Sequence, residues 1–126
     1  MFINSKKQGD AGVGQAIGYF TSLGHTVCIP LADSQNYDLV VDYGELKRVQ
    51  VKFASYKRTP LSPFAVELRV KGGNKTGTGK TKFFDNSVDI LFICTSDYKM
   101  YVIPTEVIDC KSCLTLCDKY DKYKVN

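Results

Sequence analysis

The sequence has 126 residues, of which 44% are hydrophobic and 24% are charged, and it contains five Cys and no Trp. This length fits one domain of roughly 100 to 150 residues, and the composition excludes a disordered or fibrous protein. No apolar run approaches the roughly 18 residues of a membrane-spanning helix, and the first ten residues do not resemble a signal peptide. We therefore expect one soluble, intracellular (cytoplasmic) domain over residues 1–126, with reduced cysteines.

The net charge of +4 is unevenly distributed along the chain. Residues 1–45 have a net charge of −3 and residues 85–126 have −2, whereas residues 46–84 contain ten basic residues against Glu67 alone, a net of +9. A block this basic is typical of a protein that binds a polyanion such as nucleic acid. A merely solvated basic surface is the alternative reading.

The N-terminal third predicts a helix, a short strand and a hairpin. Asp10 precedes an apolar pattern at helical spacing and is interpreted as the helix N-cap, with Gly24 as the C-terminal stop. Three glycines in this helix, at positions 12, 14 and 18, disfavour it and suggest a close approach to a sheet or ligand. Residues 25–30 read as a strand, and residues 37–43 and 46–55 as two strands of a hairpin that turns at Gly44.

The rest of the chain predicts more strands and short helical pieces. The expected elements are a half-buried strand at 64–71, a helical turn at 83–88, a central strand at 89–94, a hairpin arm at 99–103, a short capped helix at 104–108 and an edge strand at 113–117. The fold class is therefore α/β or α+β, with a central mixed β-sheet flanked by helices.

The hairpin places three polar residues close together. If the turn is centred near Gly44, facing residues have numbers that add to about 88, so Asp38 lies opposite Gln50. Gln50 and Lys52 share one face of their strand, whereas the valines beside them point to the other face. A carboxylate, an amide oxygen and an ammonium group at one point can hold a hard cation and stabilise charge on a phosphate. A hairpin whose outer face is simply solvated fits these residues equally well.

The segments at residues 9–13, 24–27, 37–42 and 48–52 resemble the PD-(D/E)XK endonucleases. The matching sequences are Gly-Asp-Ala-Gly-Val, Gly-His-Thr-Val, Tyr-Asp-Leu-Val-Val-Asp and Arg-Val-Gln-Val-Lys. They are most similar to a small branch that includes an intron-encoded homing endonuclease of cyanobacteria and, more distantly, archaeal Holliday-junction resolvases. This resemblance implies a restriction-endonuclease-like core and a phosphodiester hydrolase that requires Mg²⁺, with Mn²⁺ as a substitute.

The resemblance also implies roles for individual residues. Asp38 is the expected metal-binding aspartate, and Lys52 the lysine that positions the attacking water and stabilises the phosphate charge. Gln50 stands where the family usually has a second acid, although this branch tolerates glutamine there. Many relatives have a glutamate in the first helix, where this chain has Gly12, Val13 and Gly14. Asp10 is then the nearest candidate for another metal ligand, with a simple helix cap as the equally plausible alternative.

Phosphate contacts are expected from basic residues of the central block, namely Arg48, Lys57, Arg58, Lys71, Lys75, Lys80 and Lys82. The implied partner is double-stranded or branched DNA, cut by a homo-oligomer (a dimer or tetramer) that places two sites on two strands. Site-specific homing or restriction-like cleavage is the first hypothesis, and junction resolution is the second. A non-catalytic DNA-binding module fits the charge equally well, but it would not need Asp38, Gln50 and Lys52 together.

Two further motifs do not fit their usual functions. The Gly-Lys-Thr at residues 79–81 lacks the glycine that a phosphate-binding loop requires at position 74, where the chain has Asn74. Cys110, Cys113 and Cys117 lack the paired Cys-x-x-Cys knuckles of a zinc site, so half-buried cysteines are the simpler reading.

Overall fold

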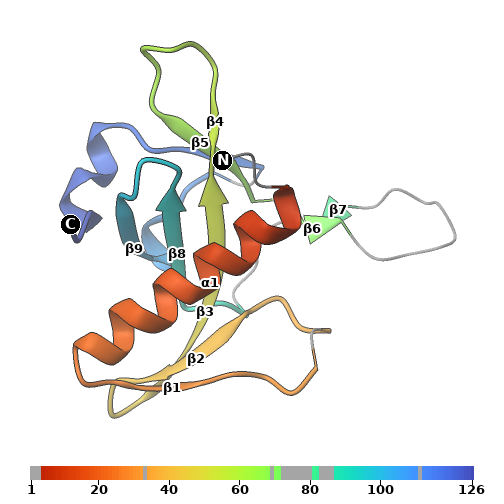
Figure 1. Cartoon of the computed structure of the whole chain (residues 1–126), viewed down its shortest axis with the longest axis vertical. Coiled ribbons are helices and arrows are strands. Elements are labelled where there is room, and N and C mark those ends of the chain that lie inside the picture. The colour runs from red at the N-terminus through yellow and green to blue at the C-terminus, as the bar shows by residue number, and fades with distance from the viewer. Residues whose placement is uncertain (1–3, 33, 69, 72–80, 83–86, 111) are drawn as a thin grey trace, which may run out of the picture.

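A computed structural model describes residues 4–32, 34–68, 70–71, 81–82, 87–110 and 112–126. Its main sheet has the strand order β1 (Thr26–Cys28), β2 (Leu39–Asp42), β3 (Leu46–Ala54), β8 (Ile90–Thr95) and β9 (Met100–Pro104). Strands β3 and β8 are parallel and the other pairs are antiparallel, so the sheet is mixed, as predicted. Helix α1 (Ser5–Ser22) lies across this sheet (Figure 1).

A smaller sheet has the order β10 (Cys113–Thr115), β5 (Phe64–Glu67) and β4 (Tyr56–Lys57). Two short strands, β6 (Val70–Lys71) and β7 (Thr81–Lys82), form a separate ribbon. The 3₁₀ helices η1 (Thr105–Val107) and η2 (Asp118–Tyr123) follow β9 and β10. No helix among the described residues has the length and hydropathy to cross a membrane.

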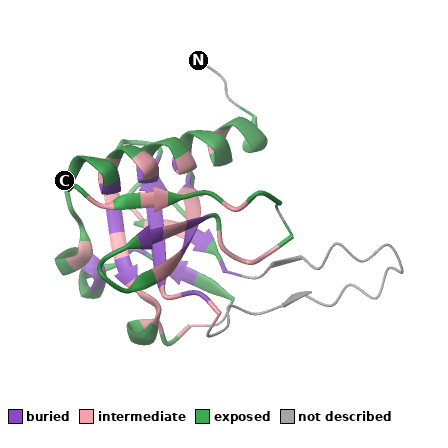
Figure 2. Ribbon diagram, turned by 90° about the horizontal axis from the view of Figure 1, so that it is seen from below, coloured by how far each residue is buried: buried purple, intermediate pink, exposed green. Residues whose placement is uncertain are grey.

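Each face of the main sheet has its own apolar core. On one face, Phe20 of α1 packs with Val49 and Phe92 of the central strands. On the other face, Leu91 and Ile93 of β8 belong to a core that includes residues of the smaller sheet. All six residues of β8 are buried, which matches the continuous apolar run predicted for a central strand (Figure 2).

The start of α1 differs from the sequence prediction. Asn4 is the N-cap, and its Oδ1 accepts a hydrogen bond of 2.9 Å from the Lys7 backbone N–H. Asp10 is an exposed residue within the helix, so its interpretation as the N-cap is wrong. The end of the helix is as predicted, because Gly24 has a φ of +87° and its N–H donates to Thr21 O.

Gly12 accounts for the close packing of α1 on the sheet. A Cβ at this position would lie 3.2 Å from Val51 Cγ1, and Phe53 lies just beyond it. A Cβ at Gly14 or Gly18 would meet nothing within 4 Å. Close approach therefore explains one of the three helix glycines.

Some of the later elements also differ from the predictions. The strand expected at 64–71 is divided into β5, which pairs with β10 and β4, and β6, which pairs with β7. The segment expected as a capped helix at 104–108 is the 3₁₀ helix η1, which has no side-chain cap. Strands β8, β9 and β10 lie where strands were expected. Residues 83–86 of the predicted helical turn lie outside the described residues.

Candidate active site

The β2–β3 hairpin has the predicted register. Leu39 faces Val49 and Val40 faces Arg48, so the numbers of paired residues add to 88. The regular pairing ends at Leu39 and Val49. Just before β2, the Asp38 N–H donates to Val49 O at 2.8 Å and not to Gln50 O, so Asp38 stays beside β3 but departs from the predicted pairing with Gln50.

A hydrogen bond fixes the carboxylate of Asp38 against β3. The Val51 N–H donates to Asp38 Oδ2 at 2.7 Å. Val51 lies between Gln50 and Lys52 in the sequence, and its side chain contacts α1 at Gly12. The backbone of one residue thus holds Asp38 beside the polar face of β3, while its side chain secures the helix on the opposite face.

Gln50 and Lys52 lie on the face of β3 away from α1. Gln50 is only 7% exposed, and its side chain makes no hydrogen bond to another described residue. No side-chain nitrogen or oxygen in the described part of the chain is both fully buried and without a hydrogen-bond partner. The small exposed part of Gln50 therefore includes its amide, which solvent or a ligand can reach.

Burial dominates the electrostatics of Asp38 and Lys52. Desolvation raises the pKa of Asp38, against the opposing effects of the Val51 hydrogen bond and the Lys52 charge. Desolvation also lowers the pKa of Lys52, although two carboxylates, Asp38 and Glu67, favour its charged form. Perturbed groups that face one another in this way are typical of functional sites.

Glu67 lies near this site and is not among the site residues predicted from the sequence. It ends β5, which pairs with β4 just after β3, and its charge acts on Lys52. Its isolation as the one acid among ten basic residues of the central block is the signal that could have identified it.

Asp10 does not join this group. It is exposed, and it precedes the buried Gly12 by two positions, which places it on nearly the opposite side of the helix. Within the described residues, no three His, Cys, Asp or Glu side chains lie close enough to hold a metal ion. The predicted ligands that remain are one carboxylate, from Asp38, and one amide, from Gln50. Such hard donors fit a Mg²⁺ ion that keeps most of its waters or takes ligands from a phosphate.

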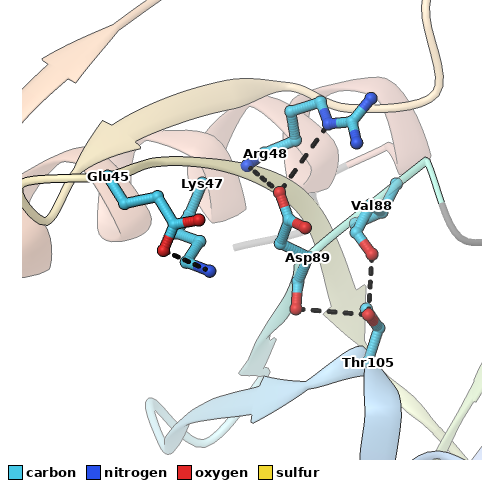
Figure 3. Close-up of polar contacts among 6 residues, drawn as sticks. All are labelled: Glu45, Lys47, Arg48, Val88, Asp89 and Thr105. Carbon is cyan, nitrogen blue, oxygen red and sulfur yellow. Dashed lines mark hydrogen bonds and ion pairs between the residues drawn. The ribbon is translucent and has the colours of Figure 1, made fainter.

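Arg48, a predicted phosphate ligand, also has a structural partner (Figure 3). Asp89 Oδ2 accepts a 2.8 Å hydrogen bond from the Arg48 backbone N–H and lies 3.7 Å from Arg48 Nε. At the start of η1, Thr105 Oγ1 donates to Val88 O at 2.7 Å, which ties this helix to the residues just before β8. Arg48 thus helps to join β3 to β8, while its side chain remains 44% exposed.

The other predicted phosphate ligands are only partly described. Lys57 Nζ lies 4.5 Å from the centre of the Phe64 ring, and Arg58 is exposed beside it. Lys71 and Lys82 lie in the β6–β7 ribbon. Lys75 and Lys80 lie outside the described residues.

Comparisons with known proteins agree with this geometry. A family model described as PD-(D/E)XK endonuclease matches residues 3–121. The structure is similar to that of a bacterial homing endonuclease, I-Ssp6803I, with a TM-score of 0.79 and 27% sequence identity over 97% of this chain and 89% of that one. No curated protein sequence matches. The predicted family and α+β fold class are confirmed, and the chain belongs to the PD-(D/E)XK endonuclease family.

Proposed function

We propose that this chain is a site-specific DNA endonuclease that requires a divalent cation, with Asp38, Gln50 and Lys52 as its active site. The observation that carries the proposal is the hydrogen bond from Val51 N–H to Asp38, which holds the carboxylate beside the polar face of β3. The basic central block supports DNA as the substrate. The similarity to a homing endonuclease favours cleavage at specific sites.

Each residue then has a separate task in phosphodiester hydrolysis. Asp38 and Gln50 hold the cation through oxygen atoms, and Mg²⁺ fits these donors. The cation, when bound, supplies positive charge and a water of lowered pKa. Lys52 places its ammonium beside the phosphate and stabilises the charge that develops as water attacks phosphorus and the bond to the leaving oxygen breaks. Cleavage of both strands requires two such sites, so we propose that the chain acts as a homo-oligomer.

The test compares three DNA substrates with Mg²⁺, with Mn²⁺ and with EDTA: a linear duplex library, supercoiled plasmid and a four-way junction. We expect plasmid and duplex to be cut at a small set of sites, and EDTA to abolish cleavage. Preferential cutting of the junction would identify a resolvase instead. Salt-sensitive DNA binding without any cleavage would contradict the proposal and favour a non-catalytic binding module.

A further inference from the structure

The loop between β1 and β2 forms a surface pocket next to Asp38. This pocket has a volume of about 480 Å³, and Asp38 lines it together with Ile29, Leu31 and Gln35. Both ribbon views show the loop extending beyond the edge of the sheet (Figures 1 and 2). A DNA strand bound at the candidate active site therefore comes within reach of the loop.

The loop presents apolar side chains to solvent. Leu31 is fully exposed and Ile29 is 66% exposed. Residues 29–37 contain one acid and no Lys or Arg, although residues 46–84 carry ten basic residues. The loop therefore lacks the cationic side chains that attract phosphates, and its branched apolar side chains suit deoxyribose and base edges.

Hydrogen bonds within the loop hold its shape. Gln35 Nε2 donates to Ala32 O at 2.7 Å, and Ser34 Oγ donates to Gln35 Oε1 at 3.1 Å. Leu31, next to Ala32 in the sequence, is left without cover by these bonds. A preformed loop loses little conformational entropy when it meets a ligand.

We propose that Leu31, with Ile29 beside it, inserts into a DNA groove and contacts the sugars and base edges next to the phosphate that lies beside Lys52 and the cation. The inference rests on the proposed nuclease function and adds to it the element that contacts DNA without charge. Apolar side chains of this kind partly unstack neighbouring base pairs and bend the duplex. Cleavage then depends on how easily the local DNA sequence deforms.

The test uses two exposed leucines of the full chain, one beside Asp38 and one distant. Leu61 is 98% exposed and belongs to a different pocket, which Leu116 and Cys117 also line. Leu31→Ser, Leu31→Met and Leu61→Ser are compared by the binding of a fluorescent duplex without divalent cation at several salt concentrations. Cleavage of supercoiled plasmid with Mg²⁺ is measured in parallel, and circular dichroism verifies that each variant is folded.

We expect Leu31→Ser to weaken DNA binding about tenfold, as partial burial of one leucine side chain implies, and to leave the slope of log Kd against log salt unchanged. Leu31→Met should bind DNA about as well as the unaltered chain, because methionine keeps an apolar side chain of similar size. The Kd of Leu61→Ser should remain within about twofold of that of the unaltered chain. As a charged reference, Lys57→Ala should reduce the salt slope by about one.

Two results would overturn the inference while leaving the nuclease proposal intact. One is equal binding by Leu31→Ser and Leu61→Ser in a protein that cuts plasmid. The other is a Leu31→Ser protein that sediments as a smaller species without DNA, since the loop would then join two copies of the chain. If the unaltered chain neither binds nor cuts DNA, the proposed function and this inference fail together.

Discussion

The two faces of β3 have different partners, although their residues alternate along one strand. Val49 is fully buried in the core beneath α1, and Val51 contacts that helix at Gly12. Gln50 and Lys52 point to the other face, next to Asp38 and Glu67. A nine-residue strand thus supports the fold with one set of side chains and the candidate chemistry with the other. Variants of either set should separate stability from cleavage.

The largest expected effect belongs to the polar face. Asp38→Asn keeps the shape of the side chain and an oxygen that can accept the Val51 hydrogen bond, but it removes the carboxylate charge. Cleavage of plasmid with Mg²⁺ should fall by about 100- to 1,000-fold or more, since a directed electrostatic contact to the reacting group is lost. The melting temperature serves as the control for folding, and cleavage at the unaltered rate would contradict the assignment of Asp38.

The next largest effect comes from the apolar face. Gly12→Val places methyl groups where even a Cβ lies 3.2 Å from Val51, and overpacking of this kind costs about 1–3 kcal/mol of unfolding free energy. Because the Val51 N–H holds Asp38, we also expect cleavage to fall about tenfold or more. Urea denaturation and plasmid cleavage measure the two effects.

Gly14→Ala is the matched control on the same helix, since a Cβ there meets nothing within 4 Å. It should stabilise the protein by up to about 1 kcal/mol, through helix propensity alone, with no change in cleavage. Equal effects of Gly12→Val and Gly14→Ala would show that the contact between α1 and β3 is unimportant.

A smaller effect is expected from Glu67→Gln. Glu67 raises the pKa of Lys52, so its removal should lower that pKa further. If Lys52 acts in its charged form, the loss of cleavage at high pH should begin at a lower pH than in the unaltered chain. Full pH–rate profiles measure this, with Glu106→Gln of η1 as the control. An unchanged pH–rate profile would show that Glu67 does not influence the protonation of Lys52 during cleavage.

The smallest effect concerns stability as a function of pH. Burial raises the pKa of Asp38, so its charged form is less favourable in the folded state than in the unfolded state. This penalty is present above the folded pKa and disappears as the pH falls below the unfolded value. Asp38→Asn should therefore be more stable than the unaltered chain at pH 7, by a margin that shrinks toward pH 3. Urea denaturation across this range tests it, and a margin that grows at low pH would contradict it.

The sequence predicts the hairpin well because its determinants are local. A glycine at the turn and strict alternation along β3 set the register, and the observed pairs agree with it. The helix start is less predictable, since both Asn4 and Asp10 are good cap residues and only packing distinguishes them. Glu67 is missed because its approach to Lys52 depends on how the chain turns from β3 into the β4–β5 pair, which no local pattern records.

Two lysines on opposite faces of β3 test whether the polar face of this strand carries the cleavage activity. Lys52 faces the candidate site, whereas Lys47 points to the other side and forms a 3.3 Å ion pair with Glu45 (Figure 3). Cleavage rates of plasmid are measured for Lys52→Ala and Lys47→Ala under identical conditions. We expect a loss of about 100-fold or more for Lys52→Ala and a change of less than about threefold for Lys47→Ala. Equal rates for the two variants would contradict this expectation.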